Sequence, residues 1–107
     1  MTRARTSALR VPLGVVADVA ATAARGVPGV DRLGRGGRGL ASVLAGQPVD
    51  VRLDEGEAWL RVRVVASAEV RFDALGEAVR RAVATALERQ LSLAVREVTV
   101  VVAGLGG

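Results

Sequence analysis

Two runs of alternating apolar and polar residues, 49–54 and 57–66, flank the dipeptide Glu55-Gly56 and constrain the fold more than any other feature. Such alternation places one set of side chains on each face of a strand, and a two-residue connection between the runs predicts a β-hairpin. A longer loop is the alternative, because Glu suits the positive φ of such a turn less well than Asn or Asp. Counting outward from the turn gives one face an apolar set: Val49, Val51, Leu53, Ala58, Leu60, Val62 and Val64. The chain is therefore expected to form a sheet with one apolar face.

The same register gives the other face of the hairpin a polar set. It pairs Arg52 with Trp59 and Asp50 with Arg61, which predicts a cation–π contact and an ion pair. Each is worth about 0.5–1 kcal/mol on an exposed sheet. Tryptophan beside arginines is also a common composition for a protein contact. The candidate partner-binding residues are therefore Arg52, Trp59, Arg61 and Arg63. The alternative is that Trp59 simply packs against neighbouring residues of the sheet or a helix.

The remaining elements follow from periodicity and from turn residues. Apolar residues at helical spacing predict helices over 13–25 and 73–91, the second with Asp73 as its N-cap. Residues 30–33 and 97–103 read as strands. The order helix, strand, strand, strand, helix, strand predicts an α+β two-layer sandwich, with both helices on one face of a four-stranded mixed sheet.

A chain of 107 residues has room for one small domain. Residues 1–10 carry three arginines among small polar residues and are expected to form a flexible basic arm. Residues 11–105 are expected to form the α+β domain, with a Gly/Arg-rich loop at 34–39. Residues 106–107 read as a tail.

The composition argues against an enzyme. The sequence contains no His, Cys, Tyr or Lys, which excludes Ser-His triads, thiolate and imidazole metal sites, Schiff-base lysines and P-loops. The carboxylates Asp54, Glu55 and Glu57 flank an open turn, where nothing is expected to shift a carboxyl pKa. No catalytic residue, metal site or cofactor is predicted.

The Gly/Arg-rich loop leaves one alternative function open. Arg35 and Arg38 stand among glycines, as in segments that bind single-stranded nucleic acid electrostatically. The loop holds only these two arginines and no aromatic residue, and a net charge of +4 is modest. The loop is therefore either a small nucleic-acid-binding segment or a plain linker, and the sequence favours a protein partner over nucleic acid.

Two blocks of the sequence resemble a known family. The first is the opening helix, whose small and apolar residues 15–20 lead to Val27-Pro28-Gly29-Val30. The second is the closing block, in which a long helix is followed by Val98-Thr99-Val100-Val101-Val102 and then Gly104-Leu105. Their order over residues 11–105 resembles the alkaline shock protein family, small bacterial proteins also called envelope stress response proteins. Ser92 stands where the family usually has Gly, and Val70-Arg71-Phe72 where it often has Tyr-Gly.

The resemblance implies a function that the residues alone do not give. Members of this family are thought to act without enzymatic activity in cell-envelope homeostasis, and some are held at the cytoplasmic face of the membrane by an integral membrane partner. The resemblance therefore implies a cytoplasmic scaffold or interaction domain, peripheral at the inner face of the cell membrane through a partner. The expected partners are a membrane anchor protein, a family paralogue or a second copy of the chain, with no small-molecule substrate.

Overall fold

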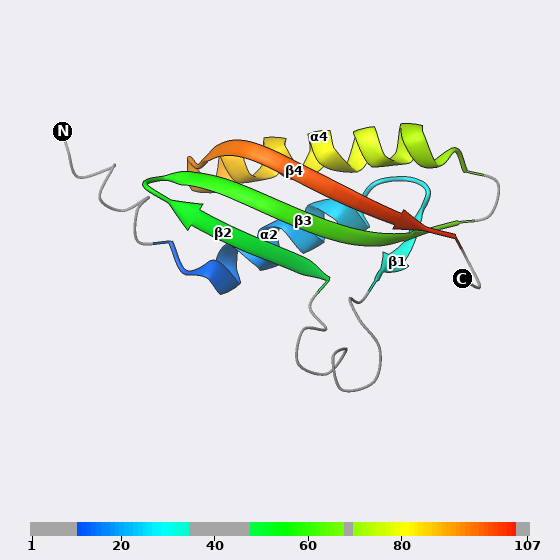
Figure 1. The fold of residues 1–107 in the computed structure, drawn as a ribbon, viewed down its shortest axis with the longest axis horizontal. Helices are drawn as coiled ribbons and strands as arrows, with labels where there is room; N and C mark the ends of the chain where they lie inside the picture. The colour runs from blue at the N-terminus through cyan, green and yellow to red at the C-terminus, as the bar shows by residue number, and fades with distance from the viewer. Residues whose placement is uncertain (1–10, 35–47, 68–69, 105–107) are drawn as a thin grey trace.

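The computed structural model describes residues 11–34, 48–67 and 70–104. The arm predicted at 1–10, the arginine-bearing part of the predicted loop and the predicted tail lie outside these ranges. Within the ranges, the elements follow the predicted order of helix, strand, strand, strand, helix and strand. They form two layers, and the predicted α+β sandwich is confirmed (Figure 1).

The hairpin has the register that the sequence predicts. Strands β2 (Val49–Asp54) and β3 (Glu57–Ala66) pair antiparallel, and Arg52 lies opposite Trp59. The connecting residues Glu55-Gly56 have φ angles of 51° and 82°. Two positive φ angles are what a type I′ turn requires, and they suit the right-handed twist of the flanking strands.

Strand β3 is the centre of the sheet and has neighbours on both edges. On one edge it pairs in parallel with β4 (Ala94–Ala103). On the other edge it pairs antiparallel with β2 along its first part and with β1 (Val30–Leu33) near its end. Where β2 gives way to β1, the Arg63 N–H donates to the Pro48 carbonyl at 2.9 Å and the Arg63 carbonyl accepts from the Gly34 N–H at 2.7 Å. The sheet is therefore mixed, as predicted.

Two helices cover one face of this sheet. Helix α2 (Leu13–Arg25) has the predicted bounds, and its buried residues are Val16, Ala20 and Ala24. Helix α4 (Phe72–Leu91) buries Leu75, Val79, Val83 and Leu87. In Figure 1 both described helices lie behind the strands, so within residues 11–34, 48–67 and 70–104 no helix covers the face of the sheet toward the viewer. We call this surface the open face.

The ends of α4 differ from the sequence expectation in one respect. The N-cap is Arg71, so the prediction of Asp73 as the cap is wrong. Asp73 lies in the first turn, where its carboxylate accepts the Ala74 N–H at 2.8 Å and pairs with Arg71 at 2.9 Å. A negative charge is favourable there because the first turn carries unpaired N–H groups. At the other end, Ser92 has a φ of 57°, in the left-handed region that glycine adopts most readily.

The core between the layers is built from small branched side chains. On β3, Leu60 is 4% exposed and Val62 is fully buried. They meet buried residues of both helices and of the neighbouring strands, among them Val16, Ala20, Val49, Val79, Val83, Leu87 and Val98. Neither Trp59 nor Phe72 belongs to this buried set. The tryptophan is therefore available to the open face.

Candidate functional site

Trp59 lies half-buried on the open face of β3. The guanidinium carbon of Arg52, on the adjoining strand β2, lies 4.0 Å from the centroid of the Trp59 ring. The predicted cation–π contact is therefore confirmed. The planar guanidinium carries five N–H donors, so a group stacked on the indole can still donate hydrogen bonds to a ligand.

Asp50 pairs with a different arginine from the one predicted. Its carboxylate lies 3.0 Å from the guanidinium of Arg63, whose side chain is 20% exposed. The backbone of Asp50 is directly opposite Arg61, as the register requires, but a long side chain on a strand also reaches the diagonal position. The predicted ion pair between Asp50 and Arg61 is therefore wrong. Arg61 is exposed and forms no ion pair within the described ranges.

A shallow hollow of about 350 Å³ lies over this part of the open face. Its polar and aromatic lining residues are Asp50, Arg52, Trp59, Arg61, Glu97 and Thr99. Three of the four predicted contact residues thus line one hollow, while Arg63 lies outside it against Asp50. Glu97 and Thr99 come from β4, and the Thr99 hydroxyl donates to the Glu97 carboxylate at 3.2 Å. The sequence could not place them here because β4 pairs with β3 from a distance along the chain.

A second hollow, of about 440 Å³, was missed by the sequence reasoning. It lies on the open face near the end of β3, and its lining includes Arg32, Arg63, Val65 and Val101. Val65 is only 8% exposed, whereas Val101 is 45% exposed. The pairing of β1 with β3 brings Arg32 opposite Val65. The charged residues within 30–33 were the only available signal for this hollow.

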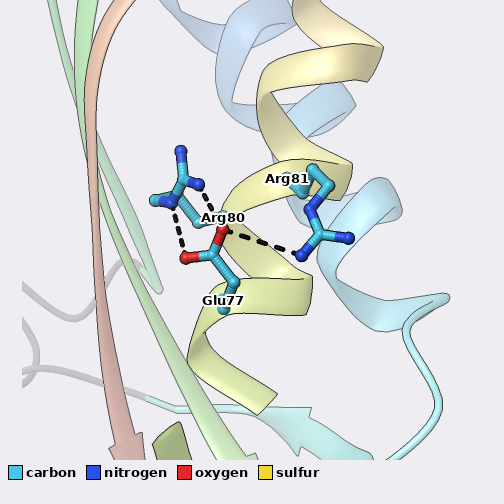
Figure 2. Close-up of polar contacts among 3 residues, drawn as sticks. All are labelled: Glu77, Arg80 and Arg81. Carbon is cyan, nitrogen blue, oxygen red and sulfur yellow. Dashed lines mark hydrogen bonds and ion pairs between the residues drawn. The ribbon is translucent and has the colours of Figure 1, made fainter. Parts of the chain in front are cut away.

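The helical layer carries a separate polar cluster, shown in Figure 2. The Arg80 guanidinium donates two hydrogen bonds to the Glu77 carboxylate, one of them at 3.0 Å. The Arg81 guanidinium lies 3.7 Å from the same carboxylate. Hydrogen bonds from Arg80 hold the pKa of the Glu77 carboxyl below its usual range. Desolvation of the carboxylate acts to raise this pKa, and the positive charges of both arginines act to lower it further. The same hydrogen bonds raise the pKa of Arg80. Glu77 and Arg81 have the i, i+4 spacing that favours an ion pair on a helix, but Arg80, at i+3, is the closer partner.

The other candidates offer less chemistry. Arg35 and Arg38 lie outside the described residues. Asp54 and Glu55 are exposed at the hairpin turn, while Glu57 is half-exposed and lies 3.8 Å from Arg96. Across residues 11–34, 48–67 and 70–104, no three carboxylates gather where they could hold a metal ion. Over the same part of the chain, no helix combines the length and the apolar character needed to span a membrane.

The fold and the open face define a small α+β domain with one exposed sheet surface, and the sequence places it in a family. The profile of the alkaline shock protein family (ASP23 family), described as having a cell envelope-related function, matches residues 2–106. The chain belongs to this family, and the resemblance seen in the sequence is confirmed. No curated protein matches the chain.

Solved structures with a similar fold include variants of MamM CTD. A methionine-to-leucine variant shares 15% identity, covers 86% of this chain and 96% of its own, and has a TM-score of 0.57. A histidine-to-alanine variant shares 15% identity with coverages of 87% and 98% and the same TM-score, 0.57. A nickel form of an aspartate-to-asparagine variant shares 15% identity, with coverages of 85% and 96% and a TM-score of 0.56. At this identity the likeness concerns the fold alone.

Proposed function

We propose that this chain is a non-enzymatic interaction domain that serves cell-envelope homeostasis by docking on a protein at the inner face of the cytoplasmic membrane. One observation carries the proposal. The two helices in the described part of the chain cover a single face of the sheet, and the other face presents the chain's only tryptophan beside Arg52 and Arg61. Tryptophan and arginine dominate the binding energy of many protein interfaces. The envelope-related family supports the cellular setting.

The character of the open face supports docking rather than catalysis. The hollow over Trp59 is shallow, and its charged groups Asp50, Arg52, Arg61 and Glu97 stand at the surface. A catalytic carboxylate usually owes its altered pKa to burial or to a second carboxylate nearby. Glu77, whose pKa is lowered by hydrogen bonds from Arg80, is held by two arginines on the helical layer and lies outside this hollow.

The test is binding of the purified protein to inverted membrane vesicles from the source cells. We expect the protein to sediment with these vesicles and to lose this binding after the vesicles are treated with protease. It should not bind liposomes made from the extracted lipids. Trp59→Ala and Arg61→Glu should each weaken binding by about tenfold or more, because they remove central residues of the interface. Arg89→Glu is the matched control, because it makes the same charge change at an exposed position on α4.

The order of measurements matters because Trp59 is half-buried. Circular dichroism must first show that Trp59→Ala is folded, since an unfolded variant would imitate a lost interface. Equal binding to liposomes of the extracted lipids would show that no protein partner is needed. A folded Trp59→Ala variant that binds vesicles as tightly as the parent would place the interface elsewhere.

A further inference from the structure

The arginines of the open face stand at regular intervals along β3. The pairing of the strands places Arg52 beside position 59 of β3 and Arg32 beside position 65. Between these two levels, β3 itself carries Arg61 and Arg63 on the same face. Four arginines therefore occupy the four consecutive open-face levels 59, 61, 63 and 65. We call Arg52, Arg61, Arg63 and Arg32 the arginine ladder. Its levels are spaced about 6.6 Å along β3 because a strand rises about 3.3 Å per residue, and Arg52 and Arg32 stand on the strands beside β3.

The ladder occupies one side of the open face only. At the same four levels, β4 contributes Glu97, Thr99, Val101 and Ala103. The cations thus follow the seam that β3 forms with β2 and β1, and the β4 side changes from acidic to apolar along its length. The two ends of the open face therefore differ: Trp59 lies at one end, and the hollow lined by Val65 lies at the other.

Part of the ladder's positive charge is balanced by the chain's own carboxylates. Asp50 pairs with Arg63, and Arg32 pairs with its neighbour Asp31 at 2.9 Å. Arg61 has no carboxylate partner in the described residues, and Arg52 is held on the Trp59 ring. The half of the ladder nearest the tryptophan therefore has the greatest capacity to take an external anion.

We propose that the open face binds an extended acidic segment of a partner protein, with carboxylates at alternate positions and an apolar side chain at one end. In an extended chain, residues i and i+2 point the same way at about 6.6 Å, which matches the steps of the ladder. The terminal apolar side chain would fill the hollow over Val65 and against Val101. The inference rests on the proposed function, because it names the chemistry of the partner that docks on this face.

The arrangement of charges favours a peptide over single-stranded nucleic acid. Glu97 lies at the level of Trp59 on β4, and Asp50 lies at the level of Arg61 on β2. A peptide can place uncharged residues against these carboxylates, whereas a polynucleotide carries a charge at every link. Stacking of bases would also require a free face of the indole, and Arg52 already lies over the ring.

Synthetic peptides test the spacing directly. One peptide alternates Glu and Ser three times and ends in Leu, so that three Glu match levels 59, 61 and 63 and the Leu matches the hollow at level 65. Its control has the same composition with three Glu, then three Ser, then Leu. Binding to the full chain is followed by anisotropy of a label on the peptide. The emission of Trp59 shows whether the peptide reaches the face, since the chain contains one Trp and no Tyr. We expect the alternating peptide to bind at least about threefold more tightly and to weaken as salt is added.

Charge-neutralising variants locate the site on the protein. Arg61→Gln and Arg52→Gln should each weaken binding of the alternating peptide by about two- to fivefold, as expected for an exposed charge pair. Arg89→Gln on α4 removes the same charge and should leave the affinity unchanged. Equal affinity for the two peptides, equal effects of Arg61→Gln and Arg89→Gln, or tighter binding of an oligothymidylate of equal charge would each overturn the proposal.

The vesicle experiment separates this proposal from the proposed function. If neither peptide binds, while Arg61→Glu and Trp59→Ala still release the protein from membrane vesicles, the acidic segment is wrong and the docking function stands. If the vesicles bind these variants as well as the parent, the docking face itself is wrong, whatever the peptides do.

Discussion

Replacing Leu60 with alanine should remove a large part of the stability of this domain. Leu60 is 4% exposed, lies on the central strand and faces the helices, with Val51 beside it on β2 and Val98 on β4. Truncation of a buried leucine costs about 2–5 kcal/mol, because it removes apolar contacts and leaves a cavity. The neighbours are mostly valines with stiff side chains, which limits collapse into the cavity, so we expect about 3 kcal/mol. A domain of this size has about 5–15 kcal/mol in all.

The measurement is equilibrium unfolding in urea, followed by circular dichroism and by Trp59 emission. With a urea slope of about 1.5 kcal/mol per molar, the midpoint should fall by about 2 M. The control is Val101→Ala, which truncates a valine on the open face that is 45% exposed, and it should change stability by less than about 1 kcal/mol. If the two variants shift the midpoint equally, the assignment of the buried and open faces is wrong.

Three further outcomes follow from the structure. Ser92→Gly should raise stability by about 0.5–1 kcal/mol in urea unfolding, because Ser92 holds a left-handed φ of 57°; an unchanged midpoint would argue against strain there. Ala20→Leu should cost about 1–3 kcal/mol by the same assay, since Ala20 is fully buried where α2 meets the core, and a neutral result would mean that the layers can separate. Arg80→Ala should raise the pKa of Glu77 toward its ordinary value in an NMR titration. Because the folded pKa is lowered, the favourable contribution of ionised Glu77 is present above its ordinary pKa and is lost as the pH falls through the lowered value; an unmoved Glu77 pKa in the variant would contradict the role of Arg80.

Local patterns in the sequence were enough to predict most of the elements. The hairpin register follows from its two-residue turn, because a shift of one residue would bury Arg52 and Arg61 and expose Leu60. The exact bounds of α2 follow from Pro12 and Gly26 on either side of an apolar stripe. Strand β4 starts at Ala94, ahead of the predicted residue 97. Local patterns could not predict this start, because this part of the strand pairs with the beginning of β3, which is far away in the sequence.

The candidate site was predicted only in part, for the same reason. Arg52 and Trp59 meet across the hairpin, so local counting places them together correctly. The partner of Asp50 depends on the reach of a side chain, which the register alone does not fix. The contributions of Arg32 and Glu97 depend on where β1 and β4 join the sheet, and these are non-local pairings. The ladder therefore becomes visible only when all four strands are assembled.

The open face is where this chain can carry a function without a cost to its fold. Both helices of the described residues pack on the Val and Leu face of the sheet, so the open face contributes little burial. Arg61 is exposed and has no ion pair in the described ranges, and replacing such a residue usually changes stability by less than about 0.5 kcal/mol. Arg61→Glu should therefore unfold at nearly the parent's urea concentration while it releases the protein from vesicles. If stability and vesicle binding fell together, the arginines would belong to a structural network instead of a docking surface.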